Sequence, residues 1–316
     1  MASITTAQAA GFSVGAVPGR YYLDQRPTDQ FFDALPFVPI EGHELLLNVI
    51  DASEGGAGSG LSEFADAEAA GAAIDQNMPS IATRTFALKR ISAEMPVDSV
   101  IPSKYGSHRD ILAGLINLKV EAVRDHCKHL LARGDSSVNA EEFDGLAKLA
   151  STYSQQTGAS SDAANGGTVL KGEIELLLTM LNPRPTNEVC YLVMHAKAFK
   201  HLNKNNYTDV EYISHATLGQ LPSIAGVAIL IDNFLPVDET RGTSNDCTSI
   251  YAVMIGEDIG LCGIFPAAVK GQEIQVRGPV VKEGTDLMWY HVSWDVALAC
   301  FNKGAIARLY GVKHSN

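Results

Sequence analysis

Apolar side chains recur at steps of three and four along one long segment, from Ile111 to Arg133. The members of this stripe are Leu112, Ile116, Val120, Val123, Cys127 and Leu130. Such spacing gives an α-helix one apolar face. Ser107 and Asp110 form a variant capping box before the segment, and Gly134 stands where a C-cap belongs. The pattern predicts a single helix, about 35 Å long at ~1.5 Å per residue, with its stripe buried.

Two segments before this helix have the pattern of extended chain. Thr83 to Ile91 alternates polar and apolar residues, which is the period of a half-buried strand. Phe37 to Ile50 ends in a short apolar run and is also predicted to be extended. Between them lie a glycine-rich breaker, Glu54 to Gly60, and an Ala-rich stretch with helical potential, Ser62 to Ala73. The sequence therefore predicts a long two-stranded excursion with material inserted near its tip.

The remainder of the chain mixes short helices and strands. Helices are expected from Asn139, capped with Glu142, to Ala150, from Thr168 to Leu178, and after Met194 as far as Leu202. Strands are expected at Glu188–Met194, Val227–Ile231, Ser249–Ile255 and Leu287–Val292. No internal repeat is found. The predicted fold class is α+β.

Composition and charge narrow the function classes. The 316 residues are 46% hydrophobic, enough for a substantial core, and the formal net charge is −12. An acidic chain does not grip nucleic acid over its whole surface, because phosphate binding requires clustered Lys and Arg. Such a chain can still enclose DNA. The long helix carries several cations with acids interspersed, which indicates a mixed-charge face rather than a nucleic-acid stripe.

Cysteine usage and targeting signals point to a cytoplasmic site of synthesis. The five cysteines are scattered, odd in number and form no C-x-x-C pair, so reduced thiols are expected. The first twenty residues carry one charge, Arg20, and no apolar core, so a secretory signal is not expected. The longest apolar run, Ile224–Ile231, is too short to span a bilayer.

Candidate chemical sites each have a simpler explanation. Gly55 and Gly60 have phosphate-loop spacing, but Leu61 occupies the position of the required lysine, so a flexible loop is preferred. His126 and His129 lie one helical turn apart and could share a metal, but no third ligand is implied, which favours a solvated helix face.

Three carboxylates, Asp232, Asp238 and Glu239, follow a buried-looking strand and could act as an acid–base pair. They also fit an ordinary acidic loop, and this interpretation is preferred. We therefore predict no catalytic, cofactor-binding or metal-binding residues, and no enzyme activity.

Three local motifs resemble a known family. Glu142-Phe143-Asp144-Gly145-Leu146 resembles an E-F-x-G-L segment that follows the long helix. Gly226–Asn233 resembles a G-x-P-I-L-I-S-D strand, with Ala228 in place of proline. The ending, with Trp289-Tyr290 and Leu309-Tyr310-Gly311-Val312, resembles closing strands with L-x-G-V. Together with the order of elements, these motifs resemble the major capsid proteins of tailed bacteriophages, whose shared fold is named after the Hong Kong 97 phage.

The resemblance covers nearly the whole chain and implies a domain plan. The plan has an N-terminal arm (1–36), an extended loop (37–105), a peripheral domain with the spine helix (106–144 and 286–316) and an axial domain (145–285). It implies self-assembly into hexamers and pentamers of an icosahedral shell around double-stranded DNA. The implied partners are a portal and a separate scaffolding protein, with a decoration protein as a further candidate. The implied location is the virion, after assembly in the host cytoplasm, with no cofactor and no membrane.

Two sets of residues are expected at subunit interfaces. On the 83–91 strand, Phe86 and Leu88 should share one face with Arg84 and Arg90, and an isolated ribbon exposing them would aggregate unless a neighbour covered it. The resemblance places the loop around residues 236–245 near the capsomer centre. Its charged residues, Asp238, Glu239 and Arg241, should meet symmetry-related copies.

Two other functions remain open. An encapsulin-type nanocompartment shell shares the fold and would hold enzymes rather than DNA. A soluble α+β hydrolase using Asp232, Asp238 or a histidine would need a pocket in which such groups converge.

Overall fold

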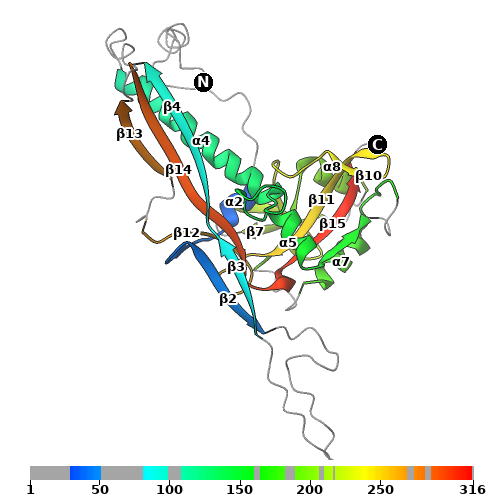
Figure 1. Ribbon diagram of the computed structural model, residues 1–316. Coiled ribbons are helices and arrows are strands. Elements are labelled where there is room, and N and C mark those ends of the chain that lie inside the picture. The colour runs from blue at the N-terminus through cyan, green and yellow to red at the C-terminus, as the bar shows by residue number, and fades with distance from the viewer. Residues whose placement is uncertain are drawn as a thin grey trace, which may run out of the picture.

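The computed structural model describes residues 29–50, 81–98, 108–159, 164–181, 189–205, 210–215, 218–268, 274–281 and 286–314. Three sequence predictions fall outside these residues: the arm before residue 29, the glycine-rich loop at 54–60 and the Ala-rich segment at 62–73. The described elements form an elongated α+β body from which one β-ribbon projects (Figure 1). The predicted fold class is confirmed.

The predicted long helix is α4 (His108–Arg133). Val123 and Leu130, which belong to its predicted stripe, are 2% and 4% exposed. The first half of the helix packs through Leu115 against Met95 and Tyr290, which lie on two long strands, β4 (Lys89–Asp98) and β14 (Leu287–Cys300). Figure 1 shows the helix running alongside these strands. Burial of the apolar stripe therefore fixes the helix on the sheet.

A five-stranded sheet is organised by β14. β14 pairs with β4 in register from Leu287↔Asp98 to Val296↔Lys89. On its other side it pairs first with β13 (Gln275–Val281) and then with β12 (Leu261–Pro266), which in turn pairs in parallel with β1 (Phe37–Ile40). The sequence predicted only the first six residues of β14.

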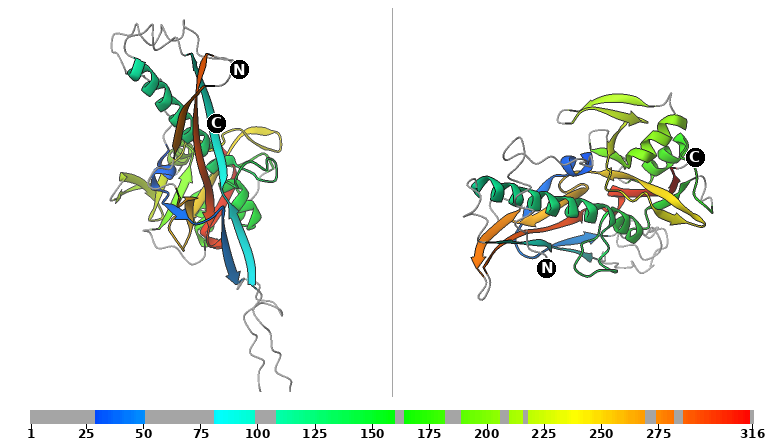
Figure 2. Two further views of the ribbon diagram at one scale, coloured as in Figure 1. Left: turned by 60° about the vertical axis from the view of Figure 1, so that its left-hand side comes forward. Right: turned by 90° about the horizontal axis from the view of Figure 1, so that it is seen from above.

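An eight-stranded sheet forms the other half of the body, and Figure 2 shows it from two further sides. Its strand order is β5 (Gln156–Gly158), β15 (Ile306–Lys313), β11 (Ser244–Met254), β6 (Cys190–Met194), β9 (Val227–Ile231), β8 (Gly219–Ile224) and β7 (Glu211–His215), with β10 (Glu239–Arg241) paired to β11. Every residue of β6 is buried, as expected of a central strand covered on both faces.

The remaining helices are α2 (Gln30–Ala34), α5 (Leu146–Thr152), α7 (Lys171–Thr179) and α8 (Ala196–Asn205), with one 3-10 turn, η2 (Lys303–Ala305). α2 lies within the expected arm, yet its Phe31 is 1% exposed, so this end of the arm belongs to the subunit's own core. The expected helix from Asn139 begins only at Leu146. The Asn139 side chain donates to Glu142 within a turn, and this local bond competes with the helix.

The projecting ribbon includes fewer residues than the predicted excursion. It consists of β2 (Glu44–Ile50) and β3 (Ile81–Ala87), paired antiparallel from Glu44↔Ala87 to Ile50↔Ile81. β1 and β4, which flank these strands in sequence, belong instead to the five-stranded sheet. The ribbon leaves the body in Figures 1 and 2.

The motif after the long helix has a packing explanation. The amide of Gly145 donates to the carbonyl oxygen of Gly134 at 2.9 Å, which brings the two segments into direct contact. A Cβ atom on Gly145 would lie 2.5 Å from the carbonyl oxygen of Leu130 and 2.7 Å from that of Leu131. Only glycine permits this approach. Phe143 beside it is 3% exposed and fills the core at the end of α4.

We expect Gly145→Ala to destabilise the subunit by ~1–3 kcal/mol, because the added methyl group meets backbone atoms that cannot rotate away. Gly172→Ala is the matched control. It lies in α7, and no atom comes within 4 Å of the position that its Cβ would take, so alanine should be neutral or stabilise by up to ~1 kcal/mol. Urea unfolding of the unassembled subunit measures both. Equal midpoints for the two variants would contradict the proposed packing.

Candidate subunit-interface surfaces

The prediction that Phe86 and Leu88 contact a neighbouring chain is wrong. Phe86 and Leu88 are 9% and 5% exposed and belong to the subunit's own hydrophobic core. They are therefore not free to cover a neighbouring chain. The error arose because the sequence shows that one face of the strand is apolar but not which surface covers it. Exposed apolar surface on the described ribbon is instead contributed by Leu46 of β2, which is 57% exposed.

Arg84 on β3 and Arg90 on β4 do not share a face, contrary to the prediction. The buried positions are Phe86 and Leu88 before the junction of β3 and β4, but Ile91 and Met95 after it, so the alternation changes phase there. Arg90 consequently points outward and makes a bidentate pair with Asp295, at 2.8 Å from Nε and 3.0 Å from Nη2.

Arg84 is also held within its own chain. Its guanidinium carbon lies 5.0 Å from the centroid of the Tyr153 ring. This cation–π contact joins β3 to the segment that follows α5. Both predicted interface arginines thus have intrachain partners, which the sequence pattern did not identify.

The acidic loop near β10 also forms intrachain ion pairs. Glu239 contacts Arg308 at 3.0 Å and accepts a hydrogen bond from Ser249 Oγ at 2.6 Å. Asp238 pairs with Arg133 at the end of α4 at 2.8 Å, but its side chain remains 68% exposed.

Arg241 lies with its guanidinium carbon 4.7 Å from the centroid of the Tyr310 ring. Of the three predicted loop residues, Glu239 is therefore the one committed to a largely buried pair, with its side chain 17% exposed. Contacts of Asp238 and Arg241 with symmetry-related copies stay predictions.

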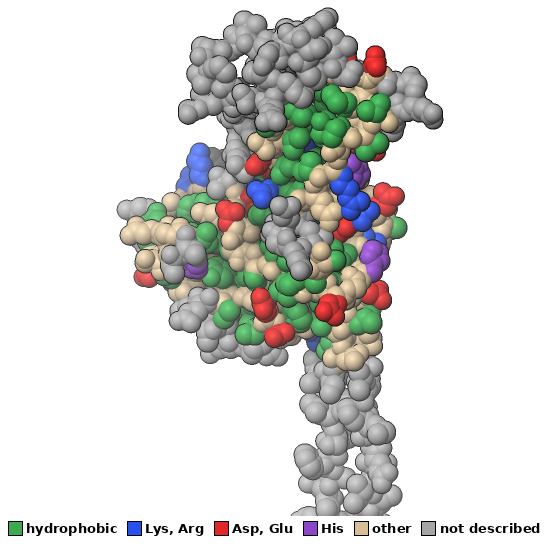
Figure 3. Space-filling view, turned by 90° about the vertical axis from the view of Figure 1, so that its left-hand side faces the viewer, with side chains coloured by type: hydrophobic (Ala, Val, Ile, Leu, Met, Phe, Trp, Pro, Cys, Tyr) green, Lys and Arg blue, Asp and Glu red, His purple; other side chains and the backbone are tan. Residues whose placement is uncertain are grey.

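Exposed apolar side chains mark a surface that the sequence did not suggest. Val276, Val280 and Val281 on β13 are 45%, 60% and 68% exposed. The described partner of β13 is β14, on one side only, so β13 is an edge strand of the five-stranded sheet. Figure 3 faces the side that carries these strands and shows hydrophobic side chains gathered in its upper part. An apolar sheet edge of this kind invites a partner or aggregates.

A buried carboxyl pair joins α2 to the eight-stranded sheet. Asp29 and Asp232 are 6% and 2% exposed and face each other across a β-bridge. Asp29 accepts from the Phe32 amide at 2.8 Å, and Asp232 accepts from the Phe234 amide at 2.7 Å. The Gln30 side chain also accepts from the Ile231 amide, which fixes the first described helix to the end of β9.

Burial and mutual repulsion shift the protonation of this pair. Burial is the main cause that raises the pKa of Asp29 to about 6, and burial followed by the charge of Asp29 raises the pKa of Asp232 well above its usual range. The ammonium of Lys128, buried on α4, partly opposes both shifts and lies 5.2 Å and 5.4 Å from the rings of Phe32 and Phe234. The cluster thus connects α2, α4 and β9.

Comparison with known proteins gives a consistent result for the fold. No family model matches the chain, and no curated protein matches it. Among solved structures, the SrpI encapsulin of Synechococcus elongatus PCC 7942 superposes with a TM-score of 0.71 at 15% identity, covering 100% of this chain and 98% of that one.

Two capsids superpose over a similar length. The capsid of cyanophage A-1(L) gives a TM-score of 0.66 at 12% identity, covering 98% of both chains. The capsid of a native GTA particle gives 0.65 at 14% identity, covering 99% of both. The chain has the Hong Kong 97-type capsid fold. The resemblance inferred from the three motifs is therefore confirmed at the level of fold.

The side chains that the sequence suggested for chemistry do not come together in one site among the described residues. His126 and His129 are both exposed on α4, and no three His, Cys, Asp or Glu side chains gather as a metal site among the described residues. Asp232 is too buried to meet a substrate. All five cysteines are buried, and burial raises the pKa of Cys190, Cys262 and Cys300 to about 12. No helix in the described part of the chain is long and apolar enough to cross a membrane.

The two acidic loop residues should differ sharply in their effect on stability. Glu239→Ala leaves Arg308, whose side chain is 18% exposed, without its carboxylate and should cost about 3 kcal/mol. Asp238→Ala removes an exposed pair with Arg133 and should cost less than ~1 kcal/mol. Chemical denaturation of the unassembled subunit measures both, and similar losses would show that the Glu239 pair is not a buried network.

The carboxyl pair predicts a pH dependence of stability. Because the folded-state pKa values are raised, the folded chain holds protons that the unfolded chain releases, so this pair lowers the free energy of unfolding as pH rises from about 4 through 6. Asp232→Asn keeps the acceptor for Phe234 and removes the repulsion. It should stabilise the subunit by roughly 1–2 kcal/mol at pH 7.5 and by almost nothing at pH 4.5.

Asp258→Asn is the control for this pH experiment, because Asp258 is exposed in a turn at φ +65°, a conformation that asparagine also tolerates. Thermal unfolding of the three proteins at both pH values provides the test. A gain from Asp232→Asn that is the same at both pH values would show that the pair does not carry the shift.

Proposed function

We propose that this chain is the major capsid protein of a tailed bacteriophage and that copies of it assemble into an icosahedral shell around double-stranded DNA. One observation carries the proposal. The fold matches shell-forming proteins over at least 98% of both chains, with TM-scores of 0.65 to 0.71. The shell-forming fold therefore accounts for essentially the whole of this sequence.

Features of the single subunit support assembly. A two-stranded ribbon projects from the body, and a ribbon of this kind is marginally stable alone in water. β13 presents an apolar edge with exposed Val276, Val280 and Val281. Both features are stabilised when a neighbouring copy covers them. The net charge of −12 also suits a shell that surrounds DNA without gripping it.

The proposal extends to partners and arrangement. Subunits form hexamers and pentamers, and assembly uses a separate scaffolding protein and a portal, with a decoration protein as a further candidate. Asp238 and Arg241 lie near the capsomer axis. The division into an arm (1–36), an extended loop (37–105), a peripheral domain (106–144 and 286–316) and an axial domain (145–285) is part of this proposal, with β2 and β3 as the projecting part of the loop. The shell is assembled in the host cytoplasm, becomes part of the virion and has no enzyme activity.

An encapsulin-type shell is the second candidate. The superposition on the SrpI encapsulin, with a TM-score of 0.71, favours it directly. Three motifs favour the phage function, because they resemble phage capsid proteins in the segment between α4 and α5, in β9, and in β14 with β15.

Electron microscopy of purified particles, followed by analysis of their contents, tests the proposal. We expect closed icosahedral shells that protect double-stranded DNA from nuclease when isolated from the natural source. Shells that contain a protein cargo and no protected DNA would establish the encapsulin alternative. A protein that stays monomeric at high concentration would refute both.

The exposed edge of β13 supplies a mutational prediction. Val280→Lys combined with Val281→Lys should leave the melting temperature of the subunit within about 2 °C, since both side chains are exposed and surface changes are worth ~0.5 kcal/mol or less. The same change should abolish shells in micrographs, because charge replaces apolar contact area. Ser151→Lys, at an exposed polar site on α5, is the control. Normal shells from the double variant would place β13 outside the interface.

A further inference from the structure

Helix α8 presents a row of cations on one face. Lys197, Lys200 and Lys204 lie three and four residues apart, which places them side by side along the helix. The opposite face carries Ala198 and Leu202, each 1% exposed and packed in the core. Like charges at this spacing oppose helix formation by ~0.2–0.5 kcal/mol per pair. Repulsion among these lysines therefore slightly destabilises α8, although the net charge of the whole protein is −12.

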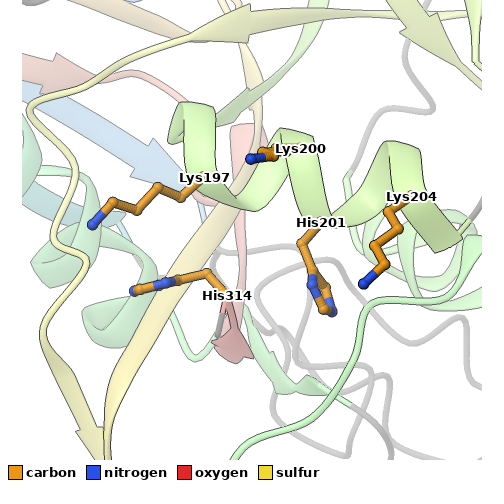
Figure 4. Close-up of a pocket in the computed structure, with 5 residues that line it drawn as sticks. All are labelled: Lys197, Lys200, His201, Lys204 and His314. Carbon is orange, nitrogen blue, oxygen red and sulfur yellow. The ribbon is translucent and has the colours of Figure 1, made fainter. Parts of the chain in front are cut away.

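These lysines line a cavity together with two histidines. The cavity has a volume of about 510 Å³, and its described lining is Lys197, Lys200, His201, Lys204 and His314. Figure 4 shows Lys197, Lys200, His201 and Lys204 on α8, and His314, which belongs to the segment after β15, below Lys197. The volume falls within the ~300–1,000 Å³ typical of small-ligand sites. Every described lining residue is basic.

The histidines are positioned rather than loose. His314 Nε2 lies 2.8 Å from the carbonyl oxygen of Val237 and donates to it, which leaves Nδ1 available to the cavity. His195, at the start of α8, accepts from the Lys197 amide through Nδ1 at 3.0 Å. The Nε2 atom of His201 is buried and has no hydrogen-bond partner among the described residues.

The local electrostatics disfavour further positive charge. Burial, and then the charge of Lys197, lowers the pKa of His195 to about 4. Burial and then Lys204 lower the pKa of His201. Burial and the neighbouring lysines thus oppose protonation of His195 and His201. An anion in the cavity would relieve the repulsion among the lysines.

We propose that this cavity binds a small polyphosphate group, such as the triphosphate of a nucleotide or inorganic polyphosphate. The three lysine positions extend over about 10 Å of helix, at ~1.5 Å per residue, so their combined charge suits a ligand with several anionic groups better than one carboxylate. Lysine binds phosphate as a point charge, and the positive end of the α8 dipole near Lys197 adds to the attraction. The site is independent of what the proposed shell contains.

Free polyphosphate is favoured over the phosphates of a DNA duplex. A duplex presents its phosphates on a broad convex surface, whereas the lysines here line a cavity of about 510 Å³. The remainder of this acidic chain would also repel a long polyanion. Both sources share the phosphate chemistry, so the experiment compares them.

Isothermal titration calorimetry of the full-length protein with inorganic tripolyphosphate is the test. We expect saturable binding that Lys197→Gln combined with Lys200→Gln weakens about tenfold or more, because two charge-assisted contacts are lost. Lys119→Gln, on α4 outside the cavity lining, removes a charge elsewhere and should leave the affinity unchanged. Binding that is absent, or equal in all three proteins, would overturn the proposal.

Two further measurements keep the test decisive. Tripolyphosphate should raise the melting temperature of the wild type but not that of the double variant, which also verifies that the variant folds. A 12-base-pair DNA duplex titrated at the same salt concentration should bind more weakly than tripolyphosphate. Tighter binding of the duplex, lost in the same variant, would assign the cavity to backbone phosphates and refute a small-anion site.

Discussion

The hydrogen bonding of strand β14 is the constraint on which the rest of the structure depends. Over its fourteen residues it pairs with β4 on one side and with β13 and then β12 on the other. β4 continues from the projecting ribbon, and α4 packs its apolar stripe over the same two strands. One long strand thus fixes the ribbon, α4 and the core relative to one another, because its backbone N–H and C=O groups are hydrogen-bonded only when all its neighbours are in register.

The charged groups of the chain serve two different purposes. Some fix the subunit internally: Arg90 with Asp295 across β4 and β14, and Arg308 with Glu239 inside the larger sheet. Their partners lie far apart in sequence, so they secure the tertiary fold rather than local structure. The lysines of α8 differ from these pairs, because they repel one another around a cavity. An acidic protein that retains such a cluster has a local potential opposite to its net charge, which is a condition for selective anion binding.

Apolar side chains also fall into two groups: some complete the core of the subunit, and others stay exposed on its surface. Phe86 and Leu88 were expected to cover a neighbour, yet they complete the subunit's own core at the base of the ribbon. The valines of β13, which the pattern did not single out, are the ones left exposed. A subunit that has its own buried core and also carries an apolar sheet edge is suited to ordered association, since the edge gains from a partner.

The sequence by itself determined the elements whose side-chain period is strong and local: α4 from its stripe, and β9 with the bounds that the structure shows. It also carried enough motif order to indicate the fold. Only the tertiary structure decided which face is covered and which charges meet. Arg90 and Asp295 are 205 positions apart, and the buried carboxyl pair depends on α2 returning to the end of β9. Periodicity depends on residues that are close in sequence, whereas burial and pairing depend on segments that only the folded chain brings together.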